Sequence, residues 1–158
     1  MKRILSLALS VILISTFMFG CSKPKAEEPN FSVKELVASM VEKGYVKMPV
    51  DIDDAMAKEI YHLNLDDIEE YAIAQTGISP GFDFILIAKA KDGKVDAVKA
   101  SVEQVLADKV GSAFYPDEID AAGRAKIAVD GNYVSLFIVW EDMEPEVLKM
   151  YHDAMGVK

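Results

Sequence analysis

Residues 84–87 (Phe-Ile-Leu-Ile) are apolar at every position and lie within a run, residues 82–90, that has the composition of a β-strand. Successive side chains of a strand point to opposite faces of the sheet. A strand that is apolar throughout is therefore covered on both faces or partly covered by a neighbouring helix. Either arrangement predicts that this strand is central in its sheet, and Asp92 and Gly93 mark its end.

Three further segments are typical of strands. Residues 71–74 precede the central run. The segment 77–81, which contains glycine and proline, is typical of a loop and separates the two strands. The Asp-Gly-Asn sequence at 130–132 lies between apolar segments at 125–129 and 133–140, which is a strong indication of a β-hairpin. Two consecutive strand pairs predict a mainly antiparallel sheet of four strands.

Helical patterns surround these strands. Ser32 and Glu35 have the spacing of a capping box, the apolar residues of 33–41 recur at helical intervals, and Gly44 is the expected stop. A second, short helix is expected after three acids that can each cap it, and it carries three apolar residues on one side: Asp51, Asp53 and Asp54, then Met56, Ile60 and Leu63.

The later helices complete the pattern. One apolar stripe predicts a helix of about four turns; it is formed by Val95, Val98, Val102, Val105, Leu106 and Val110. Residues 115–117 begin an acidic turn or short helix, and a last amphipathic helix has Pro145 in its first turn and ends before Gly156. We therefore expect an α+β domain in ββα-ββα order, with a mainly antiparallel four-stranded sheet and the N-terminal helices packed on it.

The N-terminal residues have the pattern of a secretory signal. Lys2 and Arg3 precede seventeen uncharged residues, 4–20, and Cys21, the only cysteine, follows directly. We expect three parts: a signal peptide at 1–20, a lipidated cysteine with a flexible tether at 21–30, and one domain at 31–158. The alternative is an uncleaved signal anchor in which the cysteine is incidental.

The residues Met18-Phe19-Gly20-Cys21 resemble a bacterial lipobox. This resemblance implies cleavage between Gly20 and Cys21 and a diacylglyceryl group, with palmitate-type chains, on the Cys21 thiol. Met18 and Phe19 depart from the aliphatic and small residues that the pattern prefers at these positions. The resemblance implies a lipoprotein anchored to the extracytoplasmic face of the cell membrane, because two or more acyl chains give stable anchoring.

Three stretches, residues 65–71, 84–94 and 125–133, resemble the family catalogued as domain of unknown function 4358, which occurs in lipoproteins of low-GC Gram-positive bacteria. The resemblance covers roughly residues 33–155. It implies a small acidic lipoprotein domain and supplies no catalytic residue.

Several function classes lack support in the sequence. With 26 acidic and 17 basic residues and a formal net charge of −9, the chain does not have the charge of a nucleic-acid binder. It has no glycine-rich nucleotide motif, no serine nucleophile elbow and no calcium-loop spacing. His62 and His152 are its only histidines and cannot form the usual structural zinc set. We expect no cofactor, no metal and no catalytic residue.

The acids Asp66, Asp67, Glu69 and Glu70 precede a strand, and no local structural role for them is evident from the pattern. They are a candidate contact surface, and a solvated acidic turn is the alternative. Trp140 could belong to an aromatic binding platform if it faces solvent. The sequence favours a non-catalytic extracytoplasmic module that binds an envelope protein or a small ligand; the alternative is a small hydrolase of the cell envelope that uses carboxylates or a histidine.

Overall fold

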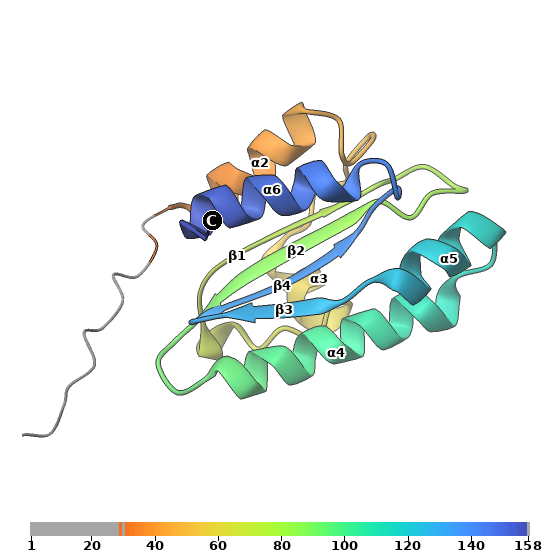
Figure 1. Cartoon of the computed structure of the whole chain (residues 1–158). Helices are drawn as coiled ribbons and strands as arrows, with labels where there is room; N and C mark the ends of the chain where they lie inside the picture. Colours follow the sequence, from red (N-terminus) through yellow and green to blue (C-terminus); the bar gives the residue numbers. More distant parts are fainter. Residues whose placement is uncertain (1–28, 30, 158) are drawn as a thin grey trace, which may run out of the picture.

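A computed structural model describes residue 29 and residues 31–157. In this part of the chain, a four-stranded antiparallel sheet lies between two layers of helices (Figure 1). The strands are β1 (Ile68–Gln75), β2 (Phe84–Ala90), β3 (Ile127–Asp130) and β4 (Tyr133–Ile138), in the order β1-β2-β4-β3. The α+β architecture and the antiparallel sheet expected from the sequence are confirmed.

Strand β2 is an interior strand, as its unbroken apolar run predicts. It pairs with β1 on one side and β4 on the other, so that Phe84 lies opposite both Gln75 and Ile138. Every residue of β2 is buried except the half-buried Lys89. The β3–β4 pair is the predicted hairpin, with Gly131 in its turn at a φ of 61°.

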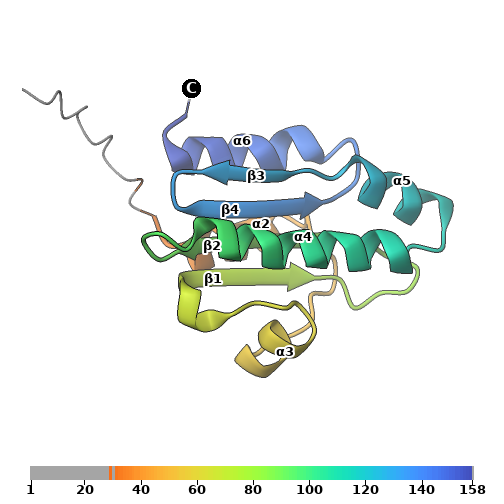
Figure 2. The same cartoon turned by 90° about the horizontal axis from the view of Figure 1, so that it is seen from below.

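One face of the sheet is covered by α4 (Val95–Ser112) and α5 (Pro116–Arg124), while α3 (Asp54–Glu59) lies beyond the β1 edge (Figure 2). Phe84, Leu86 and Ala88 of β2 pack in the hydrophobic cluster on this side. Of the two alternatives predicted after Tyr115, an acidic turn or a short helix, the structure has the helix: α5 is nine residues long and has Pro116 at its start.

The other face is covered by α2 (Val33–Glu42) and α6 (Glu144–Met155) (Figure 1). Ile85 and Ile87 of β2 point to this side, where they pack with Met40 of α2 and Tyr151 of α6. The two hydrophobic clusters explain why β2 is apolar on both faces, since each alternate set of its side chains has its own helical layer.

Two details of the expected helices are wrong. Helix α3 ends at Glu59, so Ile60 is 53% exposed, and Leu63 reaches the core from the following loop. In α4, Val110 is 50% exposed and does not belong to the buried stripe. A single 3-10 turn, η1 (Leu65–Asp67), leads into β1.

The capping box expected at the start of α2 is only half formed. Ser32 is the N-cap and its Oγ accepts a hydrogen bond from the Glu35 N–H at 3.3 Å. The carboxylate that completes the cap comes from Glu70 of β1. It accepts hydrogen bonds from the Ser32 hydroxyl at 2.7 Å, from the Val33 N–H at 3.0 Å and from the Lys34 N–H at 3.2 Å. A residue distant in sequence thus ties α2 to the sheet.

The described chain begins against one end of the sheet. The Phe31 ring stacks on the Tyr133 ring with centroids 5.0 Å apart, and the Tyr133 hydroxyl donates to the Pro29 carbonyl at 3.1 Å. Gly20, Cys21 and the expected tether lie outside the described residues. Over residues 29 and 31–157, no helix has both the length and the apolar character that a membrane crossing requires.

Candidate functional site

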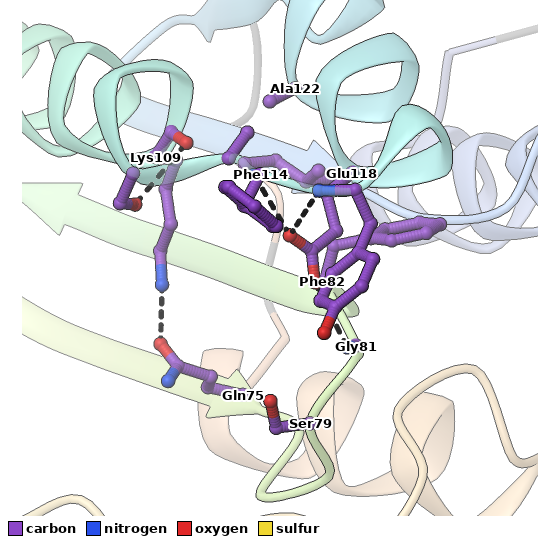
Figure 3. A pocket seen from close by; sticks show the side chains of 12 residues that line it. Gln75, Ser79, Gly81, Phe82, Lys109, Phe114, Glu118 and Ala122 are labelled. Atoms are coloured by element: carbon purple, nitrogen blue, oxygen red, sulfur yellow. Dashed lines mark hydrogen bonds between the residues drawn. The ribbon is translucent and has the colours of Figure 1, made fainter.

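A cavity of about 340 Å³ opens to solvent at the end of the sheet where β1 stops and β2 starts (Figure 3). The end of α4, the start of α5 and the β1–β2 loop enclose it. Its polar lining residues are Gln75, Ser79, Lys109, Ser112 and Glu118. Its apolar lining residues are Phe82, Ala113, Phe114, Tyr115, Ala122 and Ile138.

Lys109 is the cation of this cavity, and it reaches the sheet from the last turn of α4. Val98, Val102 and Val105 are the buried residues of that helix, and Lys109 follows Val105 by four positions. At about 100° per residue, Lys109 falls in the middle of the same stripe. A charged residue therefore occupies a core-facing position at the end of α4.

The Lys109 ammonium lies among neutral groups. It donates a hydrogen bond to the side-chain oxygen of Gln75, which also accepts from the Tyr61 hydroxyl at 2.9 Å (Figure 3). It lies 4.4 Å from the ring centroid of Phe84 and 5.6 Å from that of Tyr61. The two rings provide cation–π stabilisation, and the amide oxygen provides one acceptor.

Burial lowers the pKa of Lys109 from 10.5 to about 8, and the nearby charge of Asp108 opposes this only in part. Asp108 itself is engaged with His62, whose Nε2 lies 2.7 Å from its carboxylate oxygen. In the portion of the chain that the structure describes, no ion pair includes Lys109. The cavity therefore contains a half-buried cation that pairs with no carboxylate of the described residues.

Glu118 shapes the opposite wall. Its Oε2 accepts hydrogen bonds from the Phe114 and Tyr115 N–H groups at 3.1 and 3.2 Å, and its Oε1 accepts from the Gly81 N–H at 3.1 Å. The hydrogen bonds from Phe114 and Tyr115 are the main reason that the pKa of Glu118 is lowered. This carboxylate holds the β1–β2 loop against the start of α5 and so fixes the width of the cavity.

The space around Gly81 is tight. A Cβ at this position would lie 2.7 Å from the Ile78 carbonyl oxygen, closer than any side chain tolerates, so the loop needs glycine here. The backbone can approach Ile78 only because Gly81 has no side chain. Gly81 itself lines the cavity, so this tight backbone contact helps to shape the cavity wall.

Exposed apolar side chains surround the mouth. Phe114 is 79% exposed and Tyr115 45%, where α4 passes into α5, and Ile119, within α5, is 55% exposed. Phe82 lines the cavity and packs on Trp140 with ring centroids 4.6 Å apart, and Trp140 is 37% exposed. A group of exposed aromatic residues beside a cavity is typical of a binding surface.

A second cavity of about 210 Å³ adjoins the first, and Lys109 and Ser112 line both. Tyr61 and Asp108 are among its other lining residues. The His62–Asp108 pair lies at its edge. His62 has a left-handed backbone conformation with a φ of 55°, which ends the segment after α3.

The structure gives three of the four predicted contact acids an internal role. Asp67 pairs with Lys94 at 2.8 Å, and this hydrogen-bonded pair lowers the pKa of Asp67. Glu69 pairs with Lys89 at 2.6 Å. Glu70 caps α2; burial alone would raise its pKa, but the hydrogen bonds from the α2 N-terminus lower it overall.

Asp66 lies exposed in η1, and its carbonyl accepts a hydrogen bond from the Lys91 ammonium at 2.6 Å. Asp67, Glu69 and Glu70 therefore have structural roles that the sequence pattern did not indicate, and the contact surface stays a prediction. Across residues 29 and 31–157, no group of three or more histidines, cysteines or acids is arranged to hold a metal ion. His152 lies at the end of α6, with its ring centroid 5.8 Å from that of Tyr151.

The position of Lys109 toward the core could have been predicted from the sequence. The stripe of α4 is apolar at 98, 102 and 105 and charged at 109, and a charged residue on an apolar stripe is a candidate buried cation. The predicted stripe continues through Leu106 and Val110 instead, and therefore does not include Lys109. No pattern in the sequence places Gln75 or Glu118 opposite this lysine.

These features define a three-layer α+β domain whose sheet carries a solvent-open cavity at one end. The chain belongs to the family described as domain of unknown function DUF4358, whose model matches residues 42–139. The match is narrower than the sequence resemblance indicated and leaves out most of α2 and all of α6. It contains every residue that lines the larger cavity. No curated protein and no solved structure is detectably similar to the chain.

Proposed function

We propose that this protein is a membrane-anchored lipoprotein whose domain is a non-catalytic extracytoplasmic binding module, and that the larger cavity is its binding site. The observation that carries the proposal is Lys109, a half-buried cation that pairs with no carboxylate of the described residues and lines an open cavity beside exposed aromatic residues. Burying such a charge lowers the stability of the fold, and an unfavourable group that lines a cavity is a candidate ligand contact.

The position of the cavity supports a ligand that comes from the aqueous side. Pro29, where the described chain begins, contacts Tyr133, the first residue of β4, and the cavity includes Ile138, the last residue of that strand. Five residues of a strand span about 17 Å. A lipid on Cys21 would thus hold the domain by the end of the sheet that lies away from the cavity.

A binding role also agrees with the chemistry of the cavity. The carboxylate of Glu118 already accepts three backbone hydrogen bonds, and the lowered pKa keeps it ionised at neutral pH, so it is poorly suited to donate a proton. Below pH 8 Lys109 is mostly protonated, and its ammonium can pair with an anionic group. The two groups can therefore recognise a ligand by charge and by hydrogen bonding.

The test of binding uses full-length lipidated protein extracted from its own membrane in mild detergent. Native mass spectrometry would compare the wild type with Lys109→Met and with Lys99→Met, a matched variant on the same helix. We expect a molecule that co-purifies with the wild type and Lys99→Met and is lost from Lys109→Met. If the three proteins carry the same molecules, or none, the cavity is not the binding site and the proposal fails.

The test of anchoring uses Cys21→Ala. We expect the wild type in the membrane fraction, with an N-terminal peptide that begins at Cys21 and carries the diacylglyceryl mass. The variant should lack that mass. An unmodified cysteine in the wild type would instead support the uncleaved signal anchor.

One observation favours the hydrolase alternative enough to test it. His62 and Asp108 lie 2.7 Å apart at the edge of the second cavity, the geometry in which a carboxylate orients a general base. If this pair is catalytic, His62→Gln should abolish the cellular phenotype of the protein while leaving its melting temperature nearly unchanged. A retained phenotype would remove the alternative.

A further inference from the structure

We infer that the larger cavity takes an organic monocarboxylate with an apolar body, and that its carboxylate pairs with the Lys109 ammonium. The inference rests on the proposed function, since it names the class of ligand for the same site. It follows from the number of charges in the cavity, from the donors near Lys109 and from the aromatic residues at the mouth.

The charges limit the ligand to one negative group. Among the described residues that line the cavity, Lys109 is the only cation and Glu118 is the only anion. Figure 3 shows the Glu118 carboxylate across the cavity from the Lys109 ammonium. One carboxylate beside Lys109 neutralises this half-buried cation, whereas a phosphate dianion would leave excess negative charge near Glu118.

The donors suit a carboxylate. An ammonium group has three N–H donors, and Gln75 accepts one of them. Because the Gln75 oxygen accepts from both Lys109 and Tyr61, its amide nitrogen is a second donor in the same wall. Charge-assisted hydrogen bonds to a carboxylate are stronger than those to a neutral carbonyl, so an acid should bind better than its amide.

The apolar part of the ligand should contact the other wall. Phe82, Ala122 and Ile138 line the interior, and Phe114 and Tyr115 continue the apolar surface to the mouth. A cavity of about 340 Å³ is at the lower end of the range for small-molecule sites. It suits one ring or branched side chain beside the carboxylate, and any longer part of the ligand would extend over the exposed rim.

A free carboxylic acid and the C-terminal residue of a peptide both have this chemistry. The probes are therefore 3-phenylpropionate and the peptide acetyl-Ala-Ala-Phe with a free carboxylate, each paired with its uncharged amide. Binding would be measured by isothermal titration calorimetry on full-length lipidated protein in detergent. Lys109→Met, Lys99→Met and the wild type would be titrated with each probe.

We expect at least one acid to bind, its amide to bind roughly tenfold or more weakly, and Lys109→Met to lose the preference for the acid while Lys99→Met keeps it. Comparison of the two acids distinguishes a free carboxylic acid from a peptide C-terminus. If the peptide binds and phenylpropionate does not, the ligand is a peptide C-terminus. Binding should also weaken as the pH rises through about 8, because Lys109 loses its proton there. The charged groups near it are Asp108, which is paired with His62, and Glu118, and the pKa of each of these two carboxyls is lowered in the fold.

The inference is overturned if the amides bind as tightly as the acids, or if Lys109→Met binds the acids as well as the wild type does. A Lys109-dependent molecule in the native mass spectra would then leave the proposed function intact with a different ligand class. Absence of binding by all four probes also overturns it, and those spectra again decide separately whether the cavity binds anything. Equal melting cooperativity of the variants shows that they are folded.

Discussion

A lysine in a core-facing position needs compensation, and Lys109 has only part of it. Its stem lies with the buried stripe of α4, and its ammonium has the Gln75 oxygen and the rings of Tyr61 and Phe84. A carboxylate partner would contribute more than these neutral groups do. The Lys109 charge is therefore more stable in water than in the fold. While Lys109 is protonated, this difference should lower the free energy of unfolding, and the size of the effect should depend on pH.

Lys109→Met should stabilise the protein at neutral pH. Below pH 8 the lysine is protonated in both the folded and unfolded states, so the cost of its burial is fully present. Between pH 8 and 10.5 the folded state binds fewer protons than the unfolded state, and stability rises with pH. The gain from the substitution should be on the order of 2 kcal/mol below pH 8, after allowance for solvent screening, and should vanish by pH 10.5.

Urea denaturation of the two proteins at several pH values measures this difference. Lys99→Met is the control, because Lys99 forms an ion pair with Glu103 on the outer side of α4. Removing an exposed pair should cost about 0.5 kcal/mol or less, with no change between pH 7 and 10. A Lys109→Met protein that is less stable than the wild type at pH 7 would show that the ammonium is well compensated.

At the scale of an element, the start of α2 depends on a residue from the sheet. Glu70 accepts three hydrogen bonds there, from the Ser32 hydroxyl and from the Val33 and Lys34 N–H groups. It satisfies donors that the first turn of any helix leaves without an intrahelical partner. It also fixes α2 over β1, so the cap is a tertiary contact as well as a local one.

Glu70→Ala should therefore destabilise the protein by about 1 to 2 kcal/mol, while Glu35→Ala, at the exposed position of the expected capping box, should change stability by less than about 0.5 kcal/mol. Because the pKa of Glu70 is lowered in the fold, its contribution is present above pH 4.5 and is lost as the pH falls through the lowered value. Thermal unfolding at pH 7 and pH 3 would test both statements. A larger effect for Glu35→Ala would contradict this assignment of the cap.

The elements themselves were largely predictable, and their cross-connections were not. The apolar run of β2, the Asp-Gly-Asn turn and the stripe of α2 are local patterns that the backbone geometry requires. Glu70 and Ser32 are 38 residues apart, and Glu118 and Gly81 are 37 apart, so nothing local links them. The cavity is built from such connections, and for this reason only the core-facing position of Lys109 could be predicted from the sequence.

At the scale of the whole molecule, the sheet separates the start of the described chain from the cavity. Tyr133 pairs with Lys89 near the end of β2, whereas Phe84, at the start of β2, lies opposite Gln75 in the cavity wall. The view in Figure 1 shows the described N-terminal residues at one end of the strands and α5 at the other. A lipid-anchored domain of this shape should present α5 and the cavity away from the bilayer.

This orientation can be tested with two matched cysteine substitutions, because Cys21 is the only native cysteine and is expected to be consumed by the lipid. Asp92→Cys lies beside the β3–β4 hairpin, where Asp92 contacts Asn132 at 3.1 Å, and Asp117→Cys lies in the first turn of α5. Each removes one exposed carboxylate.

A fluorophore at residue 92 should be quenched more strongly than one at 117 in vesicles that carry spin-labelled headgroups. Ten residues, 21–30, span at most about 36 Å, so the tether limits how far the hairpin end can lie from the bilayer. With Cys21→Ala in both labelled proteins the difference should disappear. Equal quenching at the two positions in the lipidated protein would show that the domain has no preferred orientation, and stronger quenching at 117 would place the cavity against the bilayer and favour a ligand drawn from the membrane.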